Sequence, residues 1–156
     1  SAYFYGLLYK TQKNNTIDDL MVYVDNTNDT ARKKQCYWQM IRTIKKNDND
    51  PSLEAQLYLK AVSLYDENYK YLASLLNSFA WRMTEIGQLL PEALEKINYA
   101  LEIEDDLKIL DTKAEVLWKL GRVDEAIEVI NECIQGNPEY QHYQDQKAKF
   151  LETKAL

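Results

Sequence analysis

The residues that could carry out chemistry are few and scattered along the chain. His142 is the single histidine, so neither a histidine-based metal cluster nor a serine–histidine–aspartate set can form. The acidic runs at 48–50 and 105–106 lack the spacing of a calcium loop and are typical of turns. Four scattered glycines make no phosphate-binding loop. We therefore expect no enzyme activity, no metal and no other cofactor, and we expect His142 to lie exposed.

Cys36 and Cys133 are the only cysteines, and no Cys-x-x-Cys motif is present. Both fall on the apolar faces of expected helices, where a free cysteine behaves as a small apolar residue. We expect two buried thiols, and a disulfide remains the alternative.

Composition favours one helical domain. The 156 residues are 46% apolar and 28% charged, with only four glycines and three prolines, which suits helices joined by short turns. The net charge of −6 is uneven, because residues 1–72 carry ten basic and nine acidic side chains and residues 73–156 carry nine and sixteen. The acidic half is typical of a solvated surface, and it could also favour a basic partner.

No apolar run approaches the roughly 18 residues that span a bilayer. The chain begins Ser-Ala without methionine, so we expect a processed or excised piece. We expect a soluble protein, and both a cytoplasmic and an extracytoplasmic (periplasmic) location remain open.

Apolar residues recur at spacings of three and four, the helical period. We expect helices over residues 2–12, after an N-cap at Thr16, over about 30–46, and after Pro51. A last amphipathic helix is expected to open at Pro138. Its inward residues are expected to be Tyr140, Tyr143, Ala148 and Leu151, with glutamine and lysine outside.

Residues 73–106 and 107–140 repeat one pattern. Ala80 and Gly87 recur as Ala114 and Gly121, 34 residues later. A period of 33–34 residues with two helical halves is typical of stacked helical hairpins. Small residues let paired helices approach to roughly 8–10 Å, and glycine supplies the turn between them.

These two units resemble tetratricopeptide repeats (TPR). The matching positions also include Ala93 and Ala126, Ala100 and Cys133, and the closing Pro138. The resemblance implies an all-α fold, a right-handed α-α superhelix (TPR-like solenoid) of seven to nine antiparallel helices. It implies one helical-repeat domain over 1–156, with degenerate helical pairs in 1–68 and a capping helix over 138–152.

A narrower resemblance, carried by Leu76-Asn77, Ala80-Trp81 and Leu110-Asp111-Thr112, is to the helical tail of some bacterial thioredoxin-like proteins. It implies an accessory helical domain of a larger enzyme, with no ligand of its own. Since the chain has no Cys-x-x-Cys, no redox activity is implied.

The TPR resemblance implies a non-catalytic scaffold that binds a peptide segment or partner domain on its concave face. The expected face consists of helix A positions of both repeats: Ser74, Asn77, Trp81, Thr84, Glu85, Lys108, Asp111, Glu115, Trp118 and Lys119. Trp81 replaces an asparagine of the family's carboxylate clamp, and Asp111 and Glu115 add negative charge. We therefore expect a neutral or basic, partly apolar protein segment and no small-molecule substrate. Alternatively, Trp81 and Trp118 pack between helices.

Two features of the N-terminal half remain. Six basic residues between Arg32 and Lys46 permit a nucleic-acid surface as a distant alternative, but a solvated helix face is favoured. Nine of the twelve tyrosines precede residue 72, and we expect them to fill the seams between helices.

Overall fold

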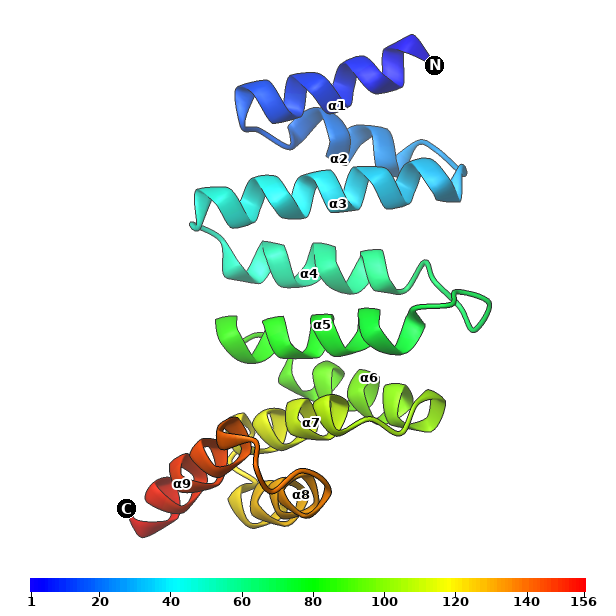
Figure 1. The fold of residues 1–156 in the computed structure, drawn as a ribbon. Coiled ribbons are helices and arrows are strands. Elements are labelled where there is room, and N and C mark those ends of the chain that lie inside the picture. The colour runs from blue at the N-terminus through cyan, green and yellow to red at the C-terminus, as the bar shows by residue number, and fades with distance from the viewer. The chain divides into compact units, whose positions relative to one another are not determined.

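Nine helices and no strand make up the regular structure of the chain, which the computed structural model describes over all 156 residues (Figure 1). The fold is all-α, an α-α superhelix of the TPR-like kind. It divides into two compact units, Ser1–Tyr69 (unit 1) and Lys70–Leu156 (unit 2). None of the nine helices combines the length and the apolar character that crossing a membrane demands.

Unit 1 contains four helices, which are α1 (Ala2–Asn14), α2 (Asp18–Asp25), α3 (Thr30–Asn47) and α4 (Pro51–Val62). Side chains cap three of them. The Ser1 hydroxyl oxygen accepts from the backbone N–H of Phe4 at the start of α1, and the carboxylates of Asp29 and Asp50 accept from those of Arg32 and Leu53 at the starts of α3 and α4. The predicted N-cap at Thr16 is wrong. Helix α2 begins one residue later, since Ile17 occupies the cap position and is buried in the core.

The core of unit 1 is built from large side chains. Phe4, Leu7, Leu20, Met40 and Leu57 are buried together. Tyr23, Tyr37 and Tyr58 pack partly buried against this cluster, as expected. The expectation fails for Tyr69 and Tyr71, which are exposed, and for the tyrosines of α1, because Tyr3, Tyr5 and Tyr9 are between 61% and 69% exposed. In α1 the buried positions are 4, 7 and 11, and the helical period directs positions 3, 5 and 9 elsewhere.

Unit 2 contains the two predicted hairpins and a last helix. The hairpins are α5 (Leu72–Ile86) with α6 (Leu90–Ile103), and α7 (Leu107–Lys119) with α8 (Val123–Gly136). The small residues of the repeat, namely Ala80, Ala93, Ala100, Ala114, Ala126 and Cys133, are all 0% exposed. Their burial permits the close approach of helices that the sequence indicated. Gly87 and Gly121 follow α5 and α7 with φ angles of 65° and 80°, a conformation that glycine adopts without strain.

The last helix, α9 (Gln141–Ala155), starts three residues after Pro138 and not at it, with Tyr140 at its N-cap. Tyr143, Gln146 and Phe150 are its buried residues. The predicted inward face was therefore wrong for Tyr140, Ala148 and Leu151, all of which are exposed. Phe150 and Tyr143 join the core cluster that also contains Ala114.

Both thiols are buried and free, as predicted. Burial raises the pKa of Cys36 to about 11 and that of Cys133 to about 12, because a thiolate in an apolar surrounding loses its hydration. Each cysteine therefore stays neutral and serves as a packing residue.

Candidate functional site

A hollow of about 200 Å³ opens in unit 2 between α5, α7 and the first turn of α9. It is lined by Asn77, Trp81, Lys108, Asp111, Thr112, Tyr140, His142 and Tyr143. Drug-sized ligands occupy pockets of roughly 300–1,000 Å³. A hollow of this size suits one side chain or a short stretch of a peptide.

Hydrogen-bond acceptors lie buried in this hollow. Asn77 Oδ1 is buried and has no hydrogen-bond partner. Asp111 is only 8% exposed, and its Oδ1 accepts a hydrogen bond of 3.1 Å from Gln146 Nε2. Its Oδ2 lies 2.7 Å from Nε2 of His142. An unpaired buried acceptor costs roughly 1–3 kcal/mol, so a ligand with an N–H group would remove that cost at Asn77.

Aromatic rings form the other walls of the hollow. The ring of His142 lies between those of Trp81 and Tyr140, with centroid distances of 6.4 and 5.6 Å. Tyr140 meets Tyr143 edge-on at 4.8 Å. Burial raises the pKa of Tyr143 to about 12, so its hydroxyl remains neutral. Lys108 is the exposed cation of the lining.

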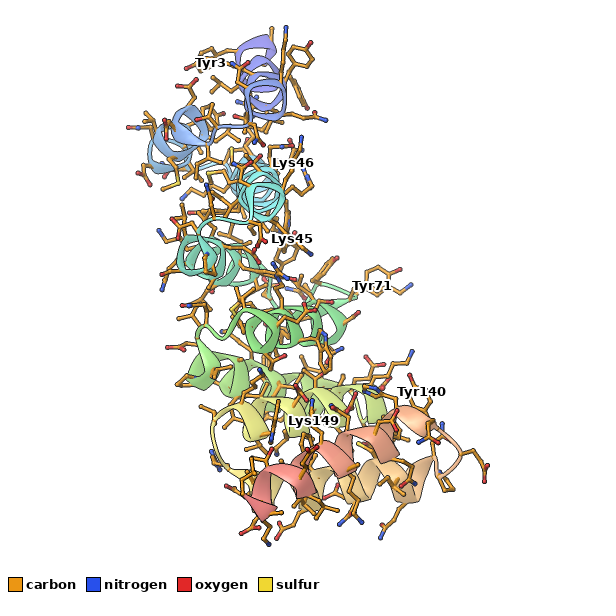
Figure 2. The ribbon with its side chains drawn as sticks, turned by 90° about the vertical axis from the view of Figure 1, so that its left-hand side faces the viewer. Tyr3, Lys45, Lys46, Tyr71, Tyr140 and Lys149 are labelled. Atoms are coloured by element: carbon orange, nitrogen blue, oxygen red, sulfur yellow. The ribbon has the colours of Figure 1, made fainter.

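One turn further along α7, residues of α9 cover a similar set of groups. Lys149 Nζ donates to Glu115 Oε2 at 2.7 Å and lies 4.3 Å from the centroid of the Trp118 ring. Gln146 also donates to Glu115 Oε2, at 3.0 Å, and so links both acidic residues of α7 to α9. Figure 2 shows Lys149 on α9 beside α7, and Tyr140 at the start of α9. The carboxylate of Glu115 and the ring of Trp118 thus hold a cation supplied by the chain itself.

The structure brings four of the predicted site residues to the hollow, which are Asn77, Trp81, Lys108 and Asp111. Ser74, Glu85 and Lys119 are exposed on their helices, and Glu85 pairs with Arg82 at 3.6 Å.

The remaining predicted residues are not open groove positions. Thr84 is buried and donates to the backbone oxygen of Trp81 at 2.6 Å. Glu115 is 6% exposed beneath α9, and the indole N–H of Trp118 donates to Thr153 at 2.9 Å. At Glu115 and Trp118 the reason is that α9 packs along the face of α7 that the register alone left open.

Sequence reasoning missed the contribution of α9 to this region. His142 was expected to be exposed, but the structure pairs it with Asp111 and places it in the wall of the hollow. Gln146 was expected outside and is only 5% exposed. A polar residue that packs inward because its partner is a carboxylate elsewhere in the chain leaves no trace in an apolar periodicity.

The basic stretch of α3 divides into two parts. Arg32 stacks over Phe4 at 5.1 Å and donates to the Tyr23 hydroxyl at 3.1 Å, so it belongs to the packing of unit 1. Arg42, Lys45 and Lys46 are exposed. This arrangement fits the solvated helix face that was favoured for the stretch.

No protein-family model matches the sequence, and no curated protein matches it either. Among solved structures, that of MamA (AMB-1), a TPR-containing protein, matches 99% of this chain and 89% of its own. The TM-score is 0.61 and the sequence identity 12%, a likeness that shows the TPR-like fold alone. The second resemblance, to the tail of thioredoxin-like proteins, finds no support in these comparisons.

Proposed function

We propose that this chain is a non-catalytic interaction module that binds a peptide segment of a partner protein in the hollow of unit 2. The observation that carries the proposal is the buried, unpartnered Oδ1 of Asn77 in an aromatic-walled hollow. Stacked helical hairpins commonly present such surfaces to partners.

The hollow offers two kinds of contact to an extended peptide. Asn77 Oδ1 can accept a hydrogen bond from a backbone N–H group, which the main chain of a peptide supplies whatever its sequence. Trp81 supplies ring area beside that acceptor, and buried aromatic residues are frequent anchors of interfaces. A partly apolar segment therefore fits better than a highly charged one.

The test is selection of peptides from a random library displayed on phage, followed by affinity measurements on the enriched peptides. We expect Trp81→Ala to weaken binding by about 2 kcal/mol, roughly thirtyfold, and Asn77→Ala to weaken it less. Glu95→Ala, an exposed change on α6, is the matched control and should leave affinity unchanged.

The chain's three tryptophans locate the binding independently of mutation. In ¹H–¹⁵N spectra, an enriched peptide should move the indole signal of Trp81 and leave that of Trp38 in unit 1 in place. Peptides that bind equally to wild type and Trp81→Ala, or that move only Trp38, would contradict the proposal.

A further inference from the structure

We propose that the hollow of unit 2 receives a basic side chain, arginine or lysine, of the bound peptide. This inference rests on the proposed function, and it adds which chemical group of the peptide enters the site. It starts from a comparison of two neighbouring turns of α7.

At the second of these turns the chain already binds a cation of its own. Glu115 and the ring of Trp118 hold the ammonium group of Lys149, through an ion pair of 2.7 Å and a ring contact of 4.3 Å. A carboxylate together with an aromatic face is a combination that attracts ammonium and guanidinium groups.

The first turn presents the same two kinds of group, but the residues of α9 that contact its carboxylate are His142 and Gln146, and no lysine of α9 lies there. Asp111 supplies the carboxylate, and Trp81, Tyr140 and His142 supply rings. Asn77 Oδ1 adds a buried acceptor that no donor of this chain reaches. An arginine or lysine side chain carries three to five N–H donors and no acceptor, which matches this set.

One cation of the lining, Lys108, opposes a bound basic side chain. Lys108 is exposed, and its flexible stem lets the ammonium group stay in water, where salt screens it. The Nε2–H of His142 donates to Asp111 Oδ2, so this ring contacts the carboxylate and also forms a wall of the hollow. The buried groups therefore decide the preference, because interactions are stronger in surroundings of low polarity.

The experiment uses the full chain and four pools of short synthetic peptides. The pools share random, uncharged flanks and differ only at a fixed central residue, which is arginine, lysine, norleucine or glutamate. Titration follows the indole signal of Trp81, while the signals of Trp118 and Trp38 report the docking of α9 and the state of unit 1. We expect the arginine and lysine pools to bind about tenfold more tightly than the norleucine pool.

Two variants test the assignment to Asp111. Asp111→Asn should remove most of that tenfold preference, and Lys108→Ala should increase affinity for the basic pools about twofold. Glu132→Gln, the same change of chemistry at an exposed position of α8, should alter neither value. If Asp111→Asn loses its fold, the preference of the wild type among the four pools still decides the question.

The failures of the two proposals are distinguishable. Equal binding of the norleucine pool, or tighter binding of the glutamate pool, would overturn the basic side chain while a peptide site remained. If no pool moves the Trp81 signal, both this inference and the peptide-binding proposal are overturned.

Discussion

Unit 1 and unit 2 both pack helices against one another, but they use different residues at the contacts. Unit 1 fills its core with large side chains such as Phe4, Met40 and Leu57. Unit 2 places alanine or cysteine where helices meet, and Ala80 and Ala114 are fully buried. Small residues at contacts hold helices at a fixed close distance, so the hairpins repeat. Unit 1 also buries Ala55 and Ala61, but these residues do not recur at a fixed spacing, so unit 1 shows no period.

The largest expected effect tests the large side chains of unit 1. Phe4→Ala should lower the free energy of unfolding by about 3–5 kcal/mol, since it leaves a cavity in the core. Tyr5→Ala, the adjacent exposed residue, should change it by less than about 0.5 kcal/mol. Urea unfolding followed by the ¹H–¹⁵N indole signal of Trp38 measures both. Similar losses for the two variants would mean that α1 does not pack as described.

The second prediction tests the small residues of unit 2. Ala80→Leu and Ala114→Leu should each destabilise by about 1–3 kcal/mol, because a larger side chain forces the helices of a hairpin apart. Ala148→Leu on the exposed side of α9 is the matched control and should be close to neutral. Thermal unfolding followed by circular dichroism gives the comparison. Unchanged stability in both alanine variants would show that the contacts of the repeat are wrong.

The turns sharpen the contrast further. Helices of unit 2 end at Gly87 and Gly121, while α1 and α3 in unit 1 end at Asn15 and Asp48, which adopt positive φ angles of 56° and 48°. Gly87→Ala should cost about 1 kcal/mol, since alanine resists that conformation. Asp48→Gly should be neutral or stabilising by less than about 1 kcal/mol. Glycine removes the strain of the positive φ angle in the folded state, but it also raises the conformational entropy of the unfolded chain.

A helical glycine supplies the control for the turn variants. Gly6 lies within α1, and a Cβ added there meets nothing within 4 Å. Gly6→Ala should therefore stabilise by about 0.5–1 kcal/mol. Chemical unfolding of the three variants measures these values, and a stabilising Gly87→Ala would contradict the left-handed turn.

The same contrast explains what the sequence could predict. In unit 2 the spacing of the repeated alanines and turn glycines predicts which helices pair, so the fold of this unit could be predicted from the sequence. Only part of the site could be predicted in this way. Its predicted residues, Asn77, Trp81, Lys108 and Asp111, lie on positions of the repeat.

The contribution of α9 did not follow. Gln146 is buried because it donates to Asp111 and Glu115, more than thirty residues earlier, and such a pairing exists only once the helices have docked. The prediction that the tyrosines of α1 are buried was wrong for a related reason. Aromatic character suggested burial, but the helical phase set by Phe4 and Leu7 directs Tyr5 and Tyr9 outward.

The two cysteines give the finest comparison, because one residue type is buried in each unit. A thiol whose pKa is raised by folding binds its proton more tightly in the folded state. Its contribution to stability is complete below the pKa of the unfolded thiol, about 8.5, and is lost as the pH rises towards the folded value. Folding raises the pKa to about 11 for Cys36 and to about 12 for Cys133, so the loss begins above about pH 8.5 for both thiols.

We therefore expect the free energy of unfolding to fall with pH above about 8.5, and to fall less steeply in Cys36→Ala and in Cys133→Ala. Urea unfolding at a series of pH values measures the slopes, and tyrosine and lysine titrations common to all three proteins cancel in the comparison. Up to about pH 10 both variants should gain the same amount of stability relative to wild type, since both folded thiols remain protonated there. If the free energy of unfolding of one variant falls with pH as steeply as that of wild type, the replaced thiol reaches water in the folded protein. The core of that unit would then be packed less tightly than described.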